Sequence, residues 1–450
     1  IMGGRGFIGE ELGELLSQQN IKINLLTRSP QVLTTSFPCE IFTWSGHKIP
    51  SKALEVDAII NLVGQGVFDK RWSSDYKRKI VNSRLNSIKA LKNGLKSQPS
   101  EKRPKTIIQA SAIGYYQGTK NKGLCSESSA PGNGFLSETC QSLERECQDL
   151  NTYCRLVILR IGVVLGWTGG ALPRLWDVYA SGIGGVLGSG LQMMNWIHIA
   201  DMKKIIFDAL TNEKYSGTYN AVSPKNITNK DFHKNLCQHT PSFSSMLAPS
   251  FSVEALLGKR AEVLLGKINV FPKRLIEEGF DFQYSEFLDA LKSLISERVE
   301  TKNHYFKLKQ WLPVSQDRMW EFVSSAKNLE KITPPWLRFK IKKSSTKNIQ
   351  KNTIFDYSLS LHGIPFGWQS KITDWSPQKN FTDTQLKGPY RRWHHRHIFT
   401  PMSGGTLIED RVEYSLWLFP LSQIALPFIK NDIKKIFQYR KESLVKNLVK

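Results

Sequence analysis

The feature that most constrains this chain is a run of regularly spaced glycines at its start. Residues 3–9 read Gly-Gly-Arg-Gly-Phe-Ile-Gly, a G-x-x-G-x-x-G pattern directly before a stretch with helical spacing, 10–18. We expect Ile1 and Met2 to end a strand whose first residues precede this sequence. Glycine permits the tight strand-to-helix turn, lets the backbone approach a bound group and lets helix and strand pack closely. The N–H groups at the start of the helix then favour the phosphates of a dinucleotide.

The end of the second predicted strand, Ile21–Leu26, indicates which dinucleotide binds. Thr-Arg-Ser follows at 27–29, where an NAD site has an acidic residue that binds the ribose hydroxyls. A carboxylate would repel a 2′-phosphate, whereas a guanidinium and two hydroxyls suit it. We therefore expect NADP(H) rather than NAD(H); the alternative is that Arg28 is only a solvated loop charge. The residues predicted to bind the cofactor are Gly3, Gly6, Phe7, Ile8, Gly9, Thr27, Arg28, Ser29, Asn61 and Gly64.

Two kinds of hydrophobic pattern divide the chain near residue 300. Before it, short apolar runs such as 58–63 and 157–164 alternate with helical patterns, which is typical of strands buried on both faces of a parallel sheet. This predicts a doubly wound α/β fold. After 296–303, segments such as 353–361 alternate polar and apolar residues, as half-solvated antiparallel strands do. The last thirty residues have helical spacing, so we expect a separate α+β domain over 303–450.

The first 295 residues resemble a known family through several motifs in the same order. These motifs are the glycine loop, Asn-Leu-Val-Gly at 61–64, Asp-Lys-Arg-Trp at 69–72, Ser-Ala-Ile-Gly-Tyr-Tyr at 111–116, Leu-Arg-Ile-Gly-Val-Val-Leu-Gly at 159–166, Trp-Ile-His-Ile-Ala-Asp at 196–201, Phe-Pro-Lys-Arg-Leu at 271–275 and Glu-Gly-Phe at 278–280. They resemble those of the extended, epimerase-type short-chain dehydrogenase/reductases, and more narrowly the "epimerase family" oxidoreductases. The resemblance implies an NAD(P)-binding Rossmann domain over 1–296, with 248–295 as its C-terminal cap segment. It also implies that Tyr115, Trp196 and His198 lie at the substrate pocket.

The catalytic residues implied by this resemblance are only partly present. Short-chain reductases use a Ser, a Tyr that acts as general acid/base, and a Lys that lowers the pKa of the tyrosine. Ser111 matches the serine, but the positions of the Tyr-x-x-x-Lys pair hold Leu136 and Cys140. Leucine cannot transfer a proton, and a neutral thiol cannot replace an ammonium group. Ser111 and Tyr116 are therefore the candidate catalytic residues; the alternative for each is packing or ordinary hydrogen bonding.

Residues 303–450 resemble the helix-grip domains of the START-like (SRPBCC, polyketide cyclase/dehydrase) type. The matching stretches include 310–314, 328–336, 388–395 and 410–414. The resemblance implies a curved antiparallel sheet wrapped around the terminal helix, with a cavity for an apolar small molecule as partner.

No metal site is predicted. The sequence has no Cys-x-x-Cys pair, and on a strand His395 and His397 share one face while His394 faces the other, so at most two of the three converge. We interpret them as hydrogen-bonded strand histidines, with Glu409 and Asp410 as candidate neighbours across the sheet.

The net charge of +23, from 62 Lys and Arg against 39 Asp and Glu, is the most unusual feature of the composition. Such a charge favours anionic partners, but it is scattered along the chain without a basic tail or RNA motif, so nucleic acid is a poor third among the partners considered. No apolar run approaches the roughly 18 residues of a membrane span. Six sparse cysteines indicate a reducing compartment, and we expect a cytoplasmic protein.

Together these features predict an NADP(H)-binding oxidoreductase or epimerase that acts on an unknown, apolar carbonyl or hydroxyl substrate. A domain that binds an apolar ligand is fused to it. The missing Tyr and Lys support an alternative, a non-catalytic sensor or scaffold that binds NADP(H) without turnover. The oligomeric state cannot be predicted from the sequence.

Overall fold

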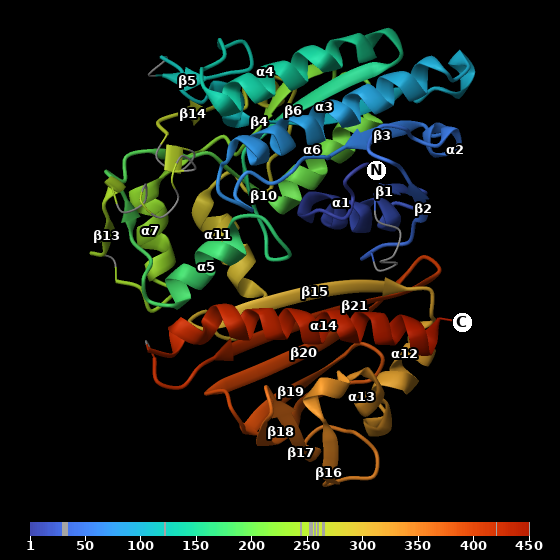
Figure 1. Ribbon diagram of the computed structural model, residues 1–450, viewed down its shortest axis with the longest axis vertical. Helices are drawn as coiled ribbons and strands as arrows, with labels where there is room; N and C mark the ends of the chain where they lie inside the picture. Colours follow the sequence, from blue (N-terminus) through green and yellow to red (C-terminus); the bar gives the residue numbers. More distant parts are fainter. Residues whose placement is uncertain are drawn as a thin grey trace.

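The computed structural model describes residues 1–28, 35–120, 123–243, 245–251, 266–419 and 421–449, together with residues 255, 258, 261 and 262. Figure 1 shows two sheets along the long axis of the molecule. The upper sheet is parallel and has helices on both faces, and the lower sheet is antiparallel and carries the long terminal helix on one face.

The start of the chain fills an inner position of the parallel sheet. Met2 makes parallel bridges to both Leu26 and Asn61, so Ile1 and Met2 fill the position between two neighbouring strands. The carboxyl ends of the strands meet at one edge, where ligands bind in doubly wound folds. The predicted α/β fold is confirmed. The strands run in the order β2 (Glu40–Thr43), β1 (Asn24–Thr27), the Ile1–Met2 pair, β3 (Ala58–Asn61), β4 (Thr106–Ala112), β6 (Arg155–Ile161) and β11 (Gly217–Ala221).

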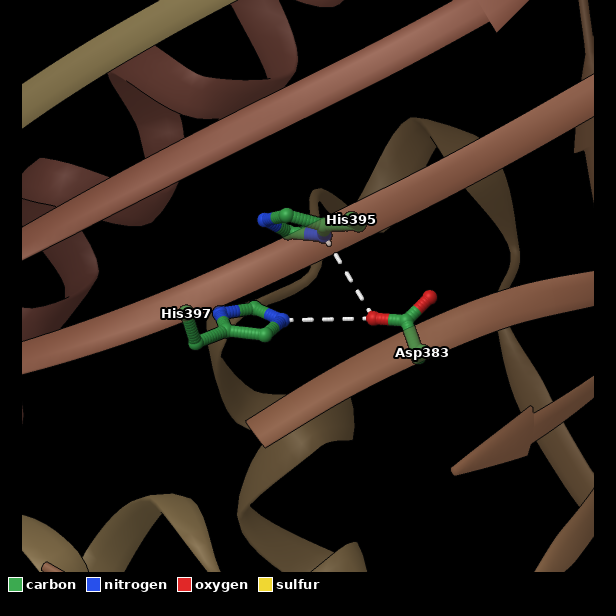
Figure 2. Close-up of side chains that lie close together, drawn as sticks. All are labelled: Asp383, His395 and His397. Carbon is green, nitrogen blue, oxygen red and sulfur yellow. Dashed lines mark hydrogen bonds and ion pairs between the residues drawn. The ribbon is translucent and has the colours of Figure 1, made fainter. Parts of the chain in front are cut away.

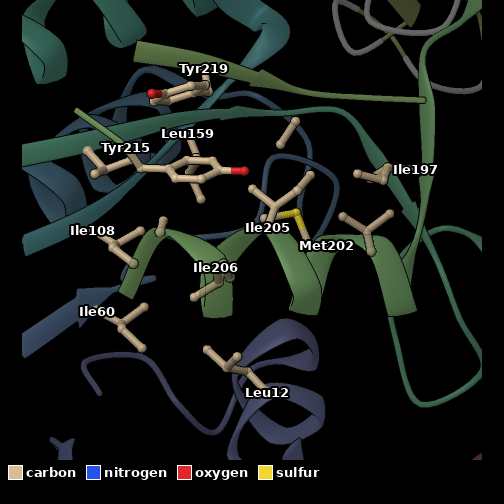
Figure 3. Packing of buried hydrophobic residues seen from close by; sticks show 14 of the residues in the cluster. Leu12, Ile60, Ile108, Leu159, Ile197, Met202, Ile205, Ile206, Tyr215 and Tyr219 are labelled. Carbon is tan, nitrogen blue, oxygen red and sulfur yellow. The ribbon is translucent and has the colours of Figure 1, made fainter. Parts of the chain in front are cut away.

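Helices cover both faces of this sheet (Figure 1). On one face Leu12, Ile205 and Ile206 pack with Ile60 and Ile108 of the strands, and all five side chains are buried (Figure 3). Burial of each side chain contributes roughly 1.5–3 kcal/mol, so the apolar stripes of the helices hold the sheet in place. The helices are α1 (Phe7–Gln18) and α6 (Ile199–Thr211) on this face, and α3 (Ser74–Lys96) and α4 (Phe135–Cys147) on the other.

Shorter elements complete this part of the chain. They are α2 (Ser51–Leu54), β5 (Leu124–Cys125), β7 (Val163–Leu165), α5 (Leu172–Ala180), β8 (Val186–Leu187), β9 (Met193–Met194), β10 (Trp196–His198), β12 (Ile227–Thr228), α7 (Asn229–Cys237), β13 (Leu247–Ala248), β14 (Asn269–Val270), α10 (Lys273–Glu277) and α11 (Phe287–Ser296). Within the described parts of the chain, no helix is both long enough and apolar enough to cross a bilayer.

An antiparallel sheet forms the rest of the structure, as the alternating pattern predicted. Its strands follow the order β15-β21-β20-β19-β18-β17-β16. The helix α14 (Leu426–Leu448) lies along it (Figure 1) and buries Ile433, Phe437 and Leu444, in keeping with the helical spacing found in the last thirty residues. The elements are β15 (His304–Leu312), α12 (Gln316–Val323), α13 (Ala326–Ile332), β16 (Lys340–Ser344), β17 (Ile354–Leu361), β18 (Ile364–Ser376), β19 (Asn380–Lys387), β20 (Arg392–Met402) and β21 (Gly405–Ser415).

The two sheets are joined through α1 and β15, which lie side by side in Figure 1. Lys309 of β15 pairs with Glu11 at 3.1 Å and with Glu14 at 2.7 Å, and the three side chains are only 10–11% exposed. Burial raises the pKa of Glu14 to about 7 against the opposing effect of Lys309, and the Glu11 carboxylate adds to the rise. These ion pairs therefore connect α1, the helix that follows the glycine loop, to the antiparallel sheet.

Candidate cofactor and catalytic site

The glycine loop makes the tight turn that a phosphate site requires. Gly3 has φ of +73°, and a Cβ there would lie 2.9 Å from the carbonyl of Leu62. A Cβ at Gly9 would lie 2.4 Å from Gly4 Cα, so the turn and the helix pack backbone against backbone. Gly6 is the N-cap of α1, and no described side chain caps this end. Since the first N–H groups of a helix have no partner within the helix, this end can hold an anion.

Phe7 and Ile8 anchor the start of α1 from the inside. A Cβ at Gly166 would lie 2.6 Å from the Phe7 ring, so the ring packs against glycine backbone. Ile8 packs against the core between α1 and the sheet. Both residues were predicted to bind the cofactor, and their inward side chains leave the backbone N–H groups as the part that could do so.

Exposed cationic residues occur in the glycine loop and directly after β1. Thr27 ends β1, and Arg28, which follows it, is exposed. Arg5, within the glycine loop, is also exposed, and guanidinium groups suit a phosphate. Sequence reasoning missed Arg5, although a cation between the glycines of a phosphate loop was a usable signal. Ser29, the other residue predicted here, lies outside the described residues.

Asn61 and Gly64 shape the loop that follows β3. Asn61 is fully buried, and its amide donates to Gln109 Oε1 at 2.7 Å and to Ser87 Oγ at 3.0 Å. Asn61 therefore braces the strand end from within. Gly64 is exposed at the edge, where its backbone can approach a ligand.

A buried polar network joins the two candidate catalytic residues. Ser111 Oγ donates to Glu144 Oε1 at 2.7 Å. Arg160 donates to both carboxylate oxygens of Glu144, at 2.9 and 2.7 Å, and to the Tyr116 hydroxyl oxygen at 2.6 Å. The Tyr116 hydroxyl lies 2.9 Å from Asn220 Oδ1, to which it can donate. Arg160 and Glu144 are only 4% and 7% exposed, so this network lies in a low-dielectric environment.

Tyr116 itself is fully buried within this network. Burial raises the pKa of its hydroxyl to about 12, and Arg160 opposes the rise. The hydroxyl is therefore neutral at pH 7 and is held by Arg160 and Asn220. These contacts give Tyr116 a bracing role, and a catalytic role for it stays a prediction.

Leu136 and Cys140 lie close to Ser111, as their sequence positions suggest. Both are on α4 and face the turn after β4, where a Cβ on Gly114 would lie 3.4 Å from Leu136 Cβ and 3.7 Å from Cys140 Sγ. Burial raises the pKa of the Cys140 thiol to about 11, and Glu144 adds to the rise. The thiol is therefore neutral at pH 7, and this pair cannot move a proton as Tyr and Lys do.

The three residues predicted at the substrate pocket have separate surroundings. Tyr115 is half-buried, with its ring centre 3.4 Å from the Arg160 guanidinium carbon. Trp196 is fully buried, and its indole N–H donates to a backbone carbonyl at 3.1 Å. His198 is buried at the N-cap of α6, where Nδ1 accepts a backbone N–H at 3.1 Å. The structure therefore brings only Tyr115 directly to the Arg160 network, and the pocket assignment of all three stays a prediction.

His198 carries no charge at neutral pH. Burial lowers its pKa to about 4; Lys203 lowers it further and Glu11 opposes the shift. Its Nε2 has no hydrogen-bond partner among the described residues. Protonation of this buried ring at acidic pH should therefore destabilise the fold.

A parallel sheet of this order, with a glycine loop after one of its inner strands, defines a dinucleotide-binding Rossmann protein. More narrowly, the chain belongs to the epimerase family: the model of the "NAD dependent epimerase/dehydratase family" matches residues 1–221. Two domains of unknown function match further along, DUF1731 over 248–294 and DUF8410 over 310–448. The family predicted for the first part of the chain is confirmed.

Relatives of this chain share its first two thirds. The "Epimerase family protein SDR39U1 homolog, chloroplastic" of Arabidopsis thaliana is 34% identical over 301 residues, which are 66% of this chain and 86% of that protein. The epimerase family protein YfhF of Bacillus subtilis is 32% identical over 300 residues, 66% of this chain and 97% of that protein. The crystal structure of human epimerase family protein SDR39U1 with NADPH is similar at a TM-score of 0.58 and 29% identity, over 66% of this chain and 98% of that chain.

Proposed function

We propose that this protein binds NADP(H) and uses it as an oxidoreductase or epimerase of the extended short-chain type. The observation that carries the proposal is the open N-terminus of α1 at the carboxyl edge of the sheet, with exposed Arg5 in the glycine loop and exposed Arg28 directly after β1. The segment 27–34 contains no acidic residue that would repel a 2′-phosphate. The human relative bound to NADPH supports the same cofactor.

Each part of the edge has a distinct task in this proposal. The cofactor supplies hydride chemistry at its nicotinamide ring. The glycine loop, residues 3–9, holds the pyrophosphate at the helix N-terminus. Thr27, Arg28 and Ser29 hold the phosphate on the ribose, and the loop 61–64 lies beside the cofactor.

Ser111 is the group that we assign to the substrate oxygen. Its hydroxyl donates to Glu144, so its oxygen can accept a hydrogen bond from a substrate hydroxyl. To bind a carbonyl substrate, Ser111 would have to turn its single proton from Glu144 to the carbonyl oxygen. Leu136 and Ile113 give this end of the sheet an apolar character, which suits an apolar carbonyl or hydroxyl substrate.

A second candidate function is a non-catalytic sensor or scaffold that binds NADP(H). Leu136 and Cys140 support it, because neither provides an acid or base at pH 7. The engaged hydroxyl of Tyr116 supports it as well. In this function, cofactor binding changes the state of the protein without turnover.

For residues 303–450 we propose a START-like helix-grip domain that binds an apolar small molecule, fused to a nucleotide-binding domain over 1–296. The long helix α14 against an antiparallel sheet supports it. So does a group of aromatic rings between sheet and helices: the centre of the Trp320 ring lies 4.8 Å from that of Trp375 and 5.7 Å from that of Phe399. Mass spectrometry of ligands released from the purified protein tests this part.

Calorimetry with NADPH and NADH tests the cofactor. We expect tighter NADPH binding, and Arg28→Glu should weaken it by roughly 10- to 100-fold, because a charged hydrogen bond of about 1.5–3 kcal/mol is lost. Lys22→Glu is the matched control, since Lys22 is exposed before β1 and has the same charge change. Preference of the unmodified protein for NADH would contradict the proposal.

Turnover separates the two candidate functions. NADPH oxidation with a panel of apolar carbonyl compounds, reduced in Ser111→Ala, would support the enzyme. Tight NADPH binding with no turnover, unaffected by Ser111→Ala, would support the sensor.

A further inference from the structure

A cluster of two histidines and two aspartates lies within the antiparallel sheet. His395 and His397 are on the same face of β20, between Asp383 of β19 and Asp410 of β21. Strand pairing places Asp383 opposite His395 and Asp410 opposite His397. His395, His397 and Asp410 are at most 5% exposed. None of the four is among the residues assigned above to the cofactor, the substrate pocket or catalysis.

Three possible ligand atoms converge at one side of the cluster. The Asp383 carboxylate faces both rings (Figure 2), and its Oδ1 lies 3.5 Å from His395 Nδ1 and 3.2 Å from His397 Nε2. Two ligands at about 2.1 Å from a tetrahedral ion lie roughly 3.4 Å apart, so both separations fit ligands of one ion. Each of the three residues offers one ligand atom, and these atoms all lie within 4.8 Å of one another.

Asp410 holds the two rings from the opposite side. Its Oδ1 lies 2.9 Å from His395 Nε2 and 2.9 Å from His397 Nδ1. A carboxylate bonded to the distal ring nitrogen is the usual outer contact of a metal-binding histidine. His395 can donate its Nε2 proton to Asp410, which leaves its Nδ1 facing Asp383 as an acceptor. A metal ion at His397 Nε2 would replace the hydrogen bond between that nitrogen and Asp383.

Two of the four close N···O approaches in the cluster are hydrogen bonds, from His395 Nε2 to Asp410 Oδ1 at 2.9 Å and from His397 Nε2 to Asp383 Oδ1 at 3.2 Å. His395 Nδ1 faces Asp383 Oδ1 at 3.5 Å, so a cation between Asp383 and the two rings would engage this nitrogen as well.

The charges that face the cluster allow such a cation. Arg440 of α14 contributes a guanidinium, with Nη2 3.4 Å from His397 Nδ1, on the side away from Asp383. Two carboxylates and one guanidinium leave a charge of −1 when the rings are neutral. The Phe381 ring stacks on His397 with centres 4.1 Å apart, and it shields this side of the cluster.

We propose that Asp383, His395 and His397 bind a divalent transition-metal ion such as Zn²⁺, with Asp410 as the outer carboxylate. Two imidazoles and one carboxylate suit Zn²⁺ and Fe²⁺ rather than Mg²⁺ or Ca²⁺. This proposal departs from the sequence prediction of no metal site. Two histidines were expected to converge, but the third ligand depends on the register of β19 against β20, which the sequence does not reveal.

Cobalt titration of the untagged full chain after chelator treatment tests the proposal. Co²⁺ held by nitrogen and oxygen ligands in a tetrahedral site absorbs visible light, so the spectrum reports binding directly. We expect saturation at one Co²⁺ per chain and loss of the bands when Zn²⁺ is added. Asp383→Asn should remove the bands, and Asp410→Asn should weaken binding about 10- to 100-fold.

His394→Gln is the matched control. His394 is on the same strand, and its ring lies 3.1 Å from Thr384 Oγ1 instead of in the cluster, so Co²⁺ binding should not change. Far-UV circular dichroism checks that each variant folds. The unmodified protein tests the proposal even if a variant does not fold. If it shows no Co²⁺ bands and retains no zinc, the proposal is overturned. Bands unchanged in folded Asp383→Asn would overturn it as well.

Discussion

Glu144→Gln tests the buried network between Ser111 and Tyr116. The Glu144 carboxylate accepts two N–H groups of Arg160, at 2.9 and 2.7 Å, and the hydroxyl of Ser111 at 2.7 Å. Since both charged side chains are less than 10% exposed, the substitution leaves a buried guanidinium without its counter-charge. Breaking such a pair costs about 3–5 kcal/mol. Glutamine keeps one acceptor oxygen, so we expect a loss near the lower end, about 3 kcal/mol.

Urea unfolding followed by far-UV circular dichroism measures this loss as a change in the free energy of unfolding. Glu146→Gln is the control on the same helix. Glu146 pairs with Lys92 at 3.0 Å, and about a quarter of each side chain is exposed, so its loss should cost no more than about 1 kcal/mol. A loss below 1 kcal/mol for Glu144→Gln, or equal losses in the two variants, would refute the argument that buried charge pairing holds the network.

Three further predictions concern the titration of a buried ring, the glycine loop and the joint between the sheets. The pKa of His198 is about 4 in the fold and about 6.5 in the unfolded chain. As the pH falls, the unfolded chain therefore binds this proton before the folded chain does. The free energy of unfolding should fall by roughly 3 kcal/mol as the pH drops from 6.5 to 4. His198→Asn, which can still cap α6, should flatten this part of the stability curve in urea; an unchanged curve would contradict the assignment. Gly9→Ala places a Cβ 2.4 Å from Gly4 Cα and should weaken NADPH binding at least about tenfold in calorimetry (1.4 kcal/mol); equal affinity would show that the turn tolerates the shift. Lys309→Met leaves Glu14 buried without its cation and should lower the free energy of unfolding by about 3–5 kcal/mol at pH 8. The decrease should be smaller at pH 5, where Glu14 is protonated. A decrease that does not depend on pH would argue against this pairing.

The turn, helix and strands at the start of the chain were largely predictable because their signals are local. The glycine spacing at 3–9 and the apolar runs before and after it determine a turn, a helix and neighbouring strands without knowledge of distant contacts. Strand ends were less accurate: the run expected at Ile21–Leu26 forms a strand at Asn24–Thr27. These ends depend on pairing with β2, which is separate in sequence.

The Ser111 network was not predicted, because it forms only when α4 packs beside the end of β6. Arg160 was its one local signal. An arginine that interrupts a buried apolar strand needs a partner, since a buried charge must be compensated, but the sequence does not show that the partner is Glu144. The same limit applies to Asp383, whose position beside His395 is set by strand register.

The ion pairs between α1 and β15 couple the glycine loop to the antiparallel sheet. The loop lies at the N-terminus of helix α1, and Lys309 pairs with Glu11 and Glu14 of this helix, the first of them about one turn after the loop. A helix transmits displacement along its axis because its backbone bonds repeat every turn. A shift of β15 along the axis of α1 would therefore tend to displace the loop with it. By reciprocity, whatever free energy the position of β15 adds to cofactor binding, bound cofactor returns to the position of β15.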